Sequence, residues 1–390
     1  MKTNMKNLLY IIIALMWPVC SSVLYAQSDS RLERELKSIM NEYEAIGLSI
    51  VVVKDNQVHY TKALGYSDME EKTPMHEDNI FRIASISKSF TSSALLKLVE
   101  EGKVSLDDNV SDLIGFPVVN PKYPDEVITL KMLLSHTSSL NDSQKYGNLN
   151  IINPAKNKSY EKCYSDYAPG TQFRYCNLGY NMAGAILEKL HNKRFDEVIR
   201  HEILEPLGME AGFNVDSLDA SRFAPLYRWN RKSESFDKSK TAYNNKLAVY
   251  NAIADNNYVL GYTGGRFSPT GGLKVSAPDL AKYMQMHMNY GEYNGKRVLS
   301  ESISKLIQTP HAKRTEDRDY GLGLLTARDV IKGKTLVGHT GSAQGLLSAM
   351  FFEPNEKYGF VVVTNGVKPA GRPHPILGEV IRTLHGHFIK

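Results

Sequence analysis

The sequence predicts an α+β fold in which an antiparallel sheet, flanked by helices, is built from both ends of the chain. Two observations lead to this prediction. Segments rich in β-branched residues cluster near the two ends, and segments with apolar residues at helical spacing accompany them. The middle of the chain has few strand patterns. We therefore expect a sheet domain over about 27–104 and 263–390, with a mostly helical insertion over about 105–262.

The N-terminal part of this domain is predicted to be a helix followed by a hairpin. A capping box at 30–33 precedes apolar residues at helical spacing, and Gly47 ends the pattern. The segments 48–53 and 58–65 are rich in β-branched residues and are separated by a polar turn at 54–57. This pattern favours two antiparallel strands.

The remaining elements follow from the same patterns. A second amphipathic helix is expected over about 86–101, because apolar residues recur along one side and Gly102 closes the pattern. The polar stretch 228–240 is interpreted as a solvated loop. Three strand patterns and a final amphipathic helix complete the chain, at 335–337, 346–353, 358–364 and 376–388.

Composition limits the classes of function. The chain has 390 residues, 42% of them hydrophobic and 23% charged, which is typical of a folded protein of enzyme size. Its formal net charge of +5 is too close to neutrality to indicate nucleic-acid binding. The 11 histidines show no ligand spacing and HExxH is absent, so we expect neither a metal site nor a cofactor.

The segment 1–26 is predicted to be a secretory signal peptide. Lys2 and Lys6 precede the apolar run 8–19, and the small residue Ala26 follows it. The run is too short to span a bilayer, so no stable membrane span is expected. A lipoprotein signal ending at Cys20 is a less favoured alternative, because bulky residues precede this cysteine. The prediction is a periplasmic or secreted protein.

Export implies an oxidising compartment for the two remaining cysteines, Cys163 and Cys176. They could form a disulfide there. Two separate buried thiols explain them equally well, and the sequence leaves both interpretations open.

A Ser-x-x-Lys motif is the strongest candidate for catalytic chemistry, since the G-x-S-x-G motif of many Ser-His-Asp hydrolases is absent. Of four copies, only Ser85 and Lys88 lie where a strongly apolar helix begins. The Ser85 hydroxyl would then sit at the positive end of the helix dipole, with Lys88 one turn away on the same face. The copy at 302–305 is interpreted as part of an ordinary exposed helix. The other copies are Ser159/Lys162 and Ser235/Lys238.

Two further motifs follow along the chain. The first is Tyr175-Cys176-Asn177, although a second Tyr-x-Asn at 146–148 shows that this tripeptide is weak by itself. The second is His339-Thr340-Gly341 on a predicted strand, between Gly338 and Ser342. A glycine inside a strand suggests that another backbone or a ligand approaches closely.

The order of the three motifs resembles that of the penicillin-recognising serine hydrolases, specifically their class C β-lactamase-like branch. Ser-x-x-Lys comes first at Ser85, Tyr-x-Asn follows at Tyr175, and His-Thr-Gly comes last at His339. The resemblance covers nearly all of the chain after the predicted signal peptide and implies the β-lactamase/transpeptidase-like fold. Further matching segments are 102–108, 133–138, 167–170, 268–273 and 320–323.

The resemblance implies that Ser85 is the acylated nucleophile and Lys88 its base or proton relay. Tyr175 would complete the proton path to the leaving group. Free lysine and tyrosine titrate near pH 10.4 and 10, so either needs a shift of about three pKa units to act as a base at neutral pH. Close placement in a desolvated cleft can supply this shift. Which of the two carries the proton stays open.

The resemblance also implies residues that bind the substrate. Asn177 would hold its amide, and the backbone N–H groups of Ser85 and Ser342 would hold the oxyanion. His339 and Thr340, followed by Gly341, would line the pocket for a substrate carboxylate. The substrate would be a small molecule or a peptide, with cell-wall peptides as one candidate class.

The sequence departs from the family pattern at His339 and at Ser139. Class C β-lactamases usually have lysine in place of His339, and histidine is largely neutral at pH 7, which makes it a weaker anchor for a carboxylate. This difference favours a peptidase or amidase acting on D-amino acids, or an esterase. A β-lactamase and a slowly deacylating penicillin-binding or sensor protein stay as alternatives. Ser139 stands where glycine is usual, which puts the local turn in question.

Overall fold

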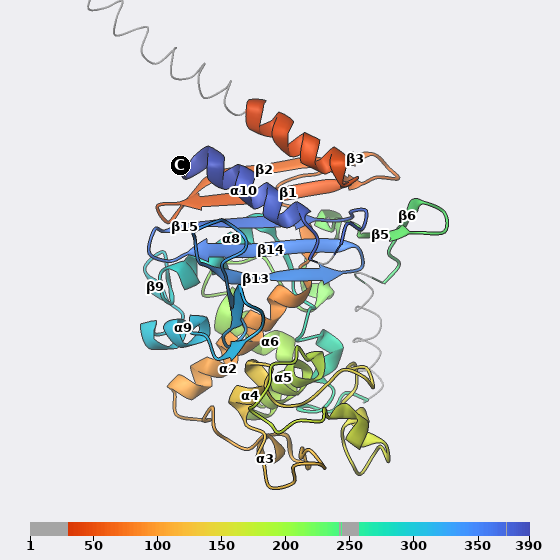
Figure 1. The fold of residues 1–390 in the computed structure, drawn as a ribbon, viewed down its shortest axis with the longest axis vertical. Helices are drawn as coiled ribbons and strands as arrows, with labels where there is room; N and C mark the ends of the chain where they lie inside the picture. Colours follow the sequence, from red (N-terminus) through yellow and green to blue (C-terminus); the bar gives the residue numbers. More distant parts are fainter. Residues whose placement is uncertain (1–29, 242, 244–256, 372) are drawn as a thin grey trace, which may run out of the picture.

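A nine-stranded antiparallel sheet forms the centre of the protein. The computed structural model describes residues 30–241, 243, 257–371 and 373–390. The strand order is β10-β11-β12-β13-β14-β15-β1-β2-β3, so strands from the two ends of the chain pair where β15 meets β1 (Figure 1). The predicted α+β fold, with a sheet built from both ends, is therefore confirmed. The predicted signal peptide at 1–26 and the alternative lipid site at Cys20 lie outside the described residues.

The strands of the sheet are long at its centre and short at its edges. They are β1 (Gly47–Lys54), β2 (Gln57–Asp68), β3 (Thr73–Pro74), β10 (Ala312–Lys313), β11 (Arg318–Tyr320), β12 (Leu325–Ala327), β13 (Leu336–Ala343), β14 (Leu346–Glu353) and β15 (Tyr358–Thr364). Three small sheets pair β4 (Ile80–Arg82) with β7 (Lys274–Ser276), β5 (Tyr227–Asn230) with β6 (Ser235–Lys238), and β8 (Glu292–Tyr293) with β9 (Lys296–Arg297).

Helices cover both faces of the sheet. The α-helices are one at residues 30–42, α2 (Ser87–Glu100), α3 (Val110–Ile114), α4 (Leu130–Leu134), α5 (Asn177–His191), α6 (Phe195–Ile199), α8 (Ala277–Met288), α9 (Glu301–Gln308) and α10 (Ile376–Phe388). Short helical turns are η1 (Ala84–Ile86), η2 (Leu149–Ile151), η3 (Tyr160–Cys163), η4 (Arg200–Leu204), η5 (Val215–Ser217), η6 (Ala220–Arg222) and η7 (Gly264–Phe267).

Most predicted elements occur where the sequence placed them. The predicted hairpin is formed by β1 and β2, and its turn passes through Asp55 and Asn56 with φ values of 51° and 59°. Positive φ at both residues gives a turn whose twist matches that of the paired strands. The patterns at 346–353, 358–364 and 376–388 coincide with β14, β15 and α10.

The interpretation of 228–240 as a solvated loop is wrong, because β5 and β6 form a hairpin there that projects from the body of the protein (Figure 1). Trp229 and Phe236 face each other across the two strands, with ring centroids 5.1 Å apart. Such a cross-strand aromatic pair stabilises a two-stranded sheet. The charged residues around this pair concealed the strand pattern in the sequence.

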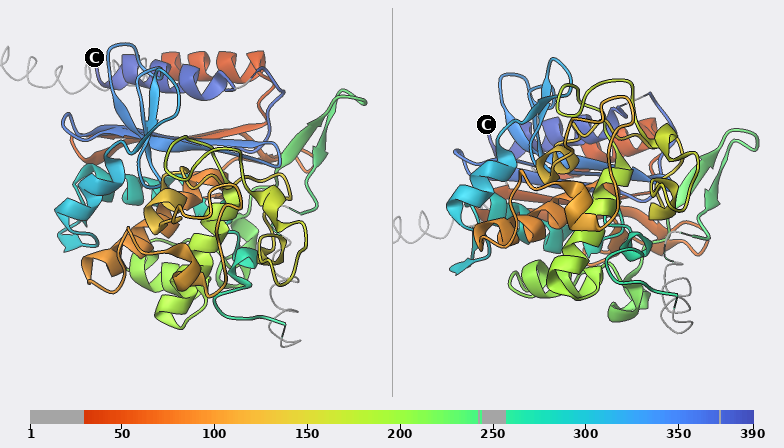
Figure 2. Two further views of the ribbon diagram at one scale, coloured as in Figure 1. Left: turned by 60° about the horizontal axis from the view of Figure 1, so that its bottom comes forward. Right: turned by 90° about the horizontal axis from the view of Figure 1, so that it is seen from below.

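The two faces of the sheet pack against different layers. In β1, Leu48, Ile50 and Val52 join a core with α10 and the helix at 30–42, whereas Val51 and Val53 join the core that contains α2, α5 and α8. Figure 2 shows α10 and the N-terminal helix on one side of the sheet and the larger helical region on the other. Strands buried on both faces explain the nearly continuous apolar runs of the sequence.

Half of β13 offers an open edge beside the start of α2. β12 pairs with β13 only at 336–338, so among the described strands the half at 339–343 is paired with β14 alone. The turn η1, which leads into α2, contacts this half of β13. The fold thus brings the predicted Ser-x-x-Lys and His-Thr-Gly segments together.

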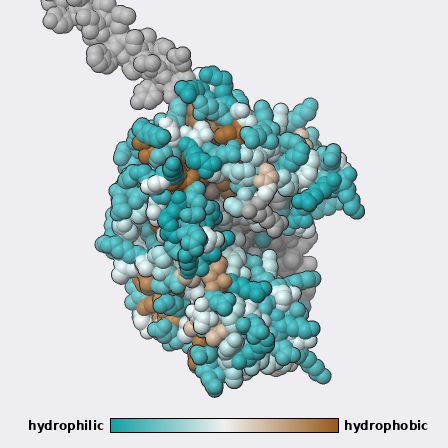
Figure 3. All heavy atoms as spheres, viewed as in Figure 1, coloured by the Kyte–Doolittle hydropathy of each residue, from teal (hydrophilic) through white to brown (hydrophobic). Residues whose placement is uncertain are grey.

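No helix in the described ranges is long and apolar enough to cross a bilayer. Figure 3 shows a mostly hydrophilic face on which apolar side chains occur in small groups. Scattered apolar residues of this kind are normal on a folded surface and mark no particular site.

Candidate active site

Ser85 lies in a tight turn that both the sheet and α2 hold in place. The residue before it, Ala84, has a φ of 53°. This left-handed conformation costs a residue with a side chain roughly 1–2 kcal/mol. Two hydrogen bonds hold the turn: Ser87 Oγ donates to the Ala84 carbonyl (2.7 Å), and Ser348 Oγ of β14 donates to the Ile83 carbonyl (2.8 Å). The Ser85 side chain remains partly exposed.

Gly341 allows β13 to reach this turn. A Cβ atom at Gly341 would lie 2.1 Å from the Ile83 carbonyl oxygen and 3.2 Å from the Ala84 Cβ. Any side chain at this position would therefore push the strand away from the nucleophile turn. The close backbone approach predicted from glycine within this strand is confirmed.

Lys88 reaches back from the first turn of α2 to Ser85. Its Nζ lies 3.3 Å from Ser85 Oγ and donates a 2.7 Å hydrogen bond to the Thr270 carbonyl. Lys88 is fully buried. Burial lowers its pKa to about 7, and the charge of Asp142 opposes this shift. The lysine is therefore substantially neutral near pH 7 to 8 while it lies within reach of the hydroxyl.

Tyr175 lies on the other side of Lys88. The Lys88 Nζ is 4.8 Å from the centroid of its ring, and the His136 ring packs against it at 4.2 Å. Its hydroxyl is buried and makes no hydrogen bond with any described residue, although Ser85 is near enough to act on its pKa. Burial raises the pKa of Tyr175, and the neighbouring Ser85 and Arg314 partly oppose the rise. The phenol consequently stays protonated at neutral pH.

Asn177 is held by a residue that the sequence analysis did not single out. Its backbone N–H and its side-chain Nδ2 both donate to Asp142 Oδ2, at 3.0 and 2.8 Å. An amide nitrogen has two hydrogens, so one N–H and the Oδ1 acceptor of Asn177 stay available for a substrate.

The His-Thr-Gly segment lies on β13 as predicted, but His339 points into the protein. It is 2% exposed, and its Nδ1 lies 2.6 Å from the Thr340 carbonyl. Because a carbonyl only accepts, Nδ1 carries the hydrogen and Nε2 accepts from the Tyr320 hydroxyl at 3.1 Å. Burial, together with the charge of Lys88, lowers the pKa of His339 to about 3.

A cavity of about 800 Å³ opens beside the other residues of this motif. Thr340, Gly341 and Ser342 line it together with Arg318 and residues at the start of α10. His339 is not among its lining residues. Ser85, Lys88 and Tyr175 do not line this cavity either. Thr340, Gly341 and Ser342 therefore border an open cavity that the nucleophile does not line, and His339 is a buried, neutral support behind Tyr175.

Comparisons with known proteins agree with this geometry. The Beta-lactamase family model matches residues 32–379. The chain belongs to the Beta-lactamase family. The resemblance to penicillin-recognising serine hydrolases is thus confirmed.

Three relatives illustrate the range of this family. Protein flp of Staphylococcus aureus (strain MRSA252) is 26% identical over 327 residues, which are 82% of this chain and 59% of that protein. Esterase EstB of Burkholderia gladioli is 27% identical over 229 residues, 54% of this chain and 57% of that protein. This Beta-lactamase family chain therefore spans under two thirds of the length of both relatives. The octameric penicillin-binding protein homologue from Pyrococcus abyssi has a TM-score of 0.74 and 27% identity, with 93% of this chain and 77% of that chain covered.

Arg314 is a second residue that the family motifs did not indicate. It lies in the turn between β10 and β11, and its guanidinium carbon is 5.7 Å from the centroid of the Tyr175 ring. Within the described part of the chain it forms no ion pair. A basic residue with no acidic partner near a motif tyrosine was not detectable from spacing, because Arg314 and Tyr175 are far apart in the sequence.

Ser139 adopts a left-handed backbone conformation, which glycine takes most easily. Its φ is 60°, and Asn120 Nδ2 donates to its Oγ at 3.0 Å. The Ser165 N–H donates to its carbonyl at 2.7 Å. The turn that Ser139 put in question is therefore formed, and hydrogen bonds from two segments hold it.

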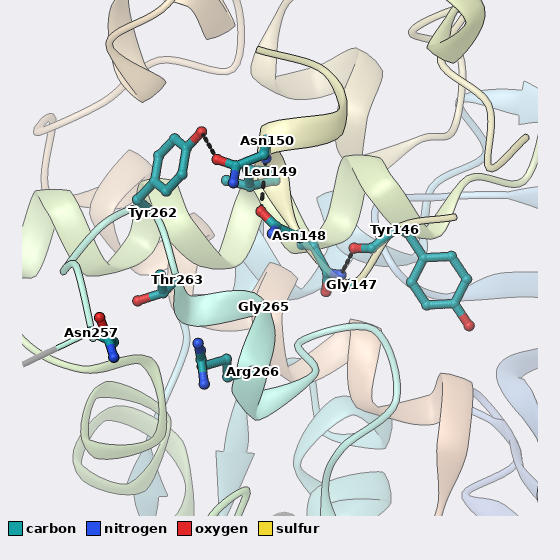
Figure 4. A pocket seen from close by; sticks show the side chains of 11 residues that line it. Tyr146, Gly147, Asn148, Leu149, Asn150, Asn257, Tyr262, Thr263, Gly265 and Arg266 are labelled. Atoms are coloured by element: carbon teal, nitrogen blue, oxygen red, sulfur yellow. Dashed lines mark hydrogen bonds between the residues drawn. The ribbon is translucent and has the colours of Figure 1, made fainter. Parts of the chain in front are cut away.

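The weaker motifs lie elsewhere. Tyr146-Gly147-Asn148 lines a separate cavity of about 370 Å³ with Tyr262 and Arg266, and neither Ser85 nor Tyr175 lines it (Figure 4). The Ser-x-x-Lys copy at 302–305 is on the exposed helix α9, where Lys305 pairs with Glu301, as interpreted from the sequence.

The two cysteines are separate buried thiols. Cys163 Sγ lies 3.4 Å from the Ile151 carbonyl, and Cys176 Sγ lies 3.4 Å from Asp142 Oδ1. They form no disulfide with each other. The structure therefore agrees with the interpretation of Cys163 and Cys176 as two separate buried thiols and not with a disulfide.

Proposed function

We propose that this protein is a serine hydrolase that forms an acyl-enzyme on Ser85 with a peptide, amide or ester substrate. The observation that carries the proposal is the 3.3 Å contact between Ser85 Oγ and the fully buried Lys88 Nζ. A hydroxyl becomes a good nucleophile when a neutral base within hydrogen-bond distance removes its proton. Lys88 meets both conditions.

The opposite effects of burial on Lys88 and Tyr175 assign their roles in this proposal. Desolvation disfavours the charged form, which is the protonated lysine but the deprotonated phenol. Lys88, with its pKa lowered to about 7, is therefore the base. Tyr175, whose pKa is raised, remains a proton donor.

The proposed reaction has two steps. Lys88 takes the Ser85 proton as Oγ bonds to the substrate carbonyl carbon, and the resulting oxyanion is held by the N–H groups of Ser85 and Ser342. The bond to the leaving group then breaks as Tyr175 supplies its proton and regains one from Lys88. A water molecule next attacks the acyl carbon and releases the acid from Ser85 by the reverse proton transfers.

Charges around the site favour substrates that carry a negative group. His339 is neutral, so it supplies no fixed positive charge. Arg314 beside Tyr175 supplies one instead. We therefore place peptides that end in a D-amino acid with a free carboxylate first, and D-amino-acid amides and neutral esters, which carry no negative group, second. A β-lactamase, or a penicillin-binding sensor that deacylates slowly, is the alternative function.

A labelling experiment tests the acyl-enzyme proposal. A fluorophosphonate should label the wild-type chain once, at Ser85, and the Ser85→Ala variant should not be labelled. The matched control is Ser302→Ala, which alters an identical tetrapeptide on α9 and should be labelled normally. Labelling that persists in Ser85→Ala would contradict the assignment of the nucleophile.

A substrate panel then separates the candidate activities. It should include p-nitrophenyl esters, D-alanine anilide, a D-Ala-D-Ala peptide and nitrocefin. Steady turnover of the D-Ala-D-Ala peptide supports the first choice, and fastest turnover of nitrocefin would identify a β-lactamase. A single burst without turnover on every compound would favour the sensor.

Export to the periplasm or the medium is also part of the proposal. It rests on the basic and apolar pattern of the segment 1–26. The expected mature chain begins at Gln27, directly after Ala26. N-terminal sequencing of protein recovered from the periplasmic fraction checks this, and a lipid-modified Cys20 would identify the alternative.

A further inference from the structure

We propose that Asp142 is a positioning residue that fixes the Tyr175-Cys176-Asn177 segment against Ser85 and Lys88 and sets the charge environment of Lys88. This inference rests on the proposed function, since it concerns the same site. Asp142 lies outside the three motifs and is half-buried. It precedes Tyr175 in the sequence and lies in the loop that follows α4.

The first argument is the set of hydrogen bonds that Asp142 accepts. Its Oδ2 receives the Asn177 backbone N–H (3.0 Å) and the Asn177 Nδ2 (2.8 Å). Its Oδ1 receives the Leu178 N–H (3.0 Å) and lies 3.4 Å from Cys176 Sγ. Hydrogen bonds to an ionised carboxylate are shorter and stronger than neutral ones. One side chain thus holds three successive residues of the site.

The second argument is that α5 has no cap of its own. Cys176 occupies the N-cap position, and its side chain makes no capping hydrogen bond. The first N–H groups of a helix need partners, above all when they are buried. His136 Nδ1 accepts the Cys176 N–H at 3.1 Å, and Asp142 accepts the next two. The segment 136–142 therefore replaces the missing cap, and it holds the tyrosine next to that cap in place.

The third argument is electrostatic and concerns the groups that face Lys88. From the nucleophile turn and the loop before β7 these are the Ser85 hydroxyl and the Thr270 carbonyl. The others are Tyr175, Cys176, Tyr180, His136, His339 and Asp142.

Among these groups Asp142 supplies a carboxylate. Its negative charge stabilises protonated Lys88 and so raises the pKa of the lysine against the effect of burial. Removal of this charge should lower the Lys88 pKa. It should also move the acidic limb of the reaction to lower pH, because neutral Lys88 would then persist there.

The test compares Asp142→Asn and Asp142→Ala with a matched control, Ser300→Ala. Ser300 caps α9 by accepting the Ile303 N–H, so its removal also deletes a helix cap but leaves the site intact. The readout is the rate of Ser85 labelling by a fluorophosphonate between pH 5.5 and 9, together with Tm. This probe requires no knowledge of the natural substrate.

We expect each variant to behave differently. Asp142→Asn keeps the size of the side chain but removes its charge and one of its two acceptor oxygens, so the midpoint of its pH–rate curve should fall by about 0.5 pH units or more. Asp142→Ala should also lose about 10- to 100-fold in the plateau rate, because the tyrosine segment is no longer held. Ser300→Ala should have a lower Tm but the wild-type midpoint and plateau.

An unchanged midpoint in Asp142→Asn, with a plateau in Asp142→Ala no lower than in Ser300→Ala, would overturn the inference. If Asp142→Ala does not fold, the midpoint of the pH–rate curve of Asp142→Asn is the test, and an unchanged midpoint overturns the inference. Failure of the proposed function would look different, because the wild-type Ser85 would then not be labelled at any pH.

Discussion

Two lysines in the described part of the chain are buried completely, yet only one of them contacts a nucleophile. Lys88 and Lys274 are both 0% exposed, and each donates a 2.7 Å hydrogen bond to a backbone carbonyl. Burial lowers the pKa of each to about 7; the charge of Arg82 adds to the effect at Lys274. The difference is that Lys88 Nζ also lies 3.3 Å from Ser85 Oγ.

This comparison shows which feature makes a lysine catalytic. A lowered pKa also occurs at Lys274, where burial and the charge of Arg82 cause it and where the ammonium donates to the Phe213 carbonyl. The turn at Ala84, held by Ser87 and Ser348, brings a hydroxyl to Lys88 and to no comparable position at Lys274. A perturbed pKa therefore identifies a functional residue only together with a reacting partner.

The largest expected effect is on activity when the two lysines are replaced separately. Lys88→Met should lower the rate of Ser85 acylation by at least about 10³-fold, because the hydroxyl loses its base. Lys274→Met should change it less than about threefold. Labelling kinetics with a fluorophosphonate measure both variants. Equal loss in both would mean that burial of a lysine, and not its contact with Ser85, controls the activity.

The pH dependence of the wild type is the second expected effect. Lys88 acts in its neutral form. The rate of Ser85 labelling by a fluorophosphonate should therefore rise about tenfold per pH unit below the Lys88 pKa of about 7 and level off above it. Tyr175 acts in its protonated form, and its raised pKa predicts no falling limb before pH 10. The same curve is expected for Lys274→Met, since the second lysine does not take part. A bell-shaped curve centred below pH 7 would contradict these roles.

The sequence predicted the central elements of this site because its strongest signals are local. The apolar helix that begins at Ser85 and the glycines around His339 each follow from neighbouring residues. Likewise, β14 and β15 are buried runs bounded by turns, which made their limits visible. Local patterns of this kind do not depend on which distant segment packs against them.

The parts that the sequence did not predict depend on contacts between distant segments. Asp142 and Arg314 are outside the three catalytic motifs and reach the site from loops that precede and follow Tyr175 in the chain. His339 was expected to line a carboxylate pocket, but its partner Tyr320 turns it inward. The β5–β6 hairpin was missed because its polar residues hide the pairing of Trp229 with Phe236. The spacing of residues along the sequence indicates none of these contacts.

Arg314 is a third basic residue that can be compared with the two lysines. Its replacement should have a smaller effect on activity than that of Lys88. Unlike the two lysines it is partly exposed, and it stands over Tyr175. Arg314→Gln should raise KM about tenfold for a D-Ala-D-Ala peptide with a free carboxylate. The C-terminal amide of the same peptide should be unaffected. Arg297→Gln is the control, since Arg297 pairs with Glu292 on the β8–β9 hairpin and does not line the cavity beside Thr340. Equal KM changes for acid and amide would mean that Arg314 does not bind the carboxylate.

The smallest expected effect is on stability, where the two lysines should behave alike. In the unfolded chain a lysine keeps its ordinary pKa near 10.4, so between about pH 7 and 10 the unfolded state binds more protons than the native state. The free energy of unfolding should therefore rise with pH across this window. Methionine has a similar shape and no charge to desolvate, but it leaves the Thr270 or Phe213 carbonyl without its donor.

The net change at pH 7 should accordingly be a gain of about 1 kcal/mol for either Lys88→Met or Lys274→Met. Each variant should also show a smaller rise in stability between pH 7 and 9 than the wild type. Urea denaturation at the two pH values measures this. A gain for Lys274→Met and a loss for Lys88→Met would show that the contact with Ser85 stabilises the folded state. It would then be wrong that burial of the charge destabilises the folded state equally at both lysines and that they differ only in catalysis.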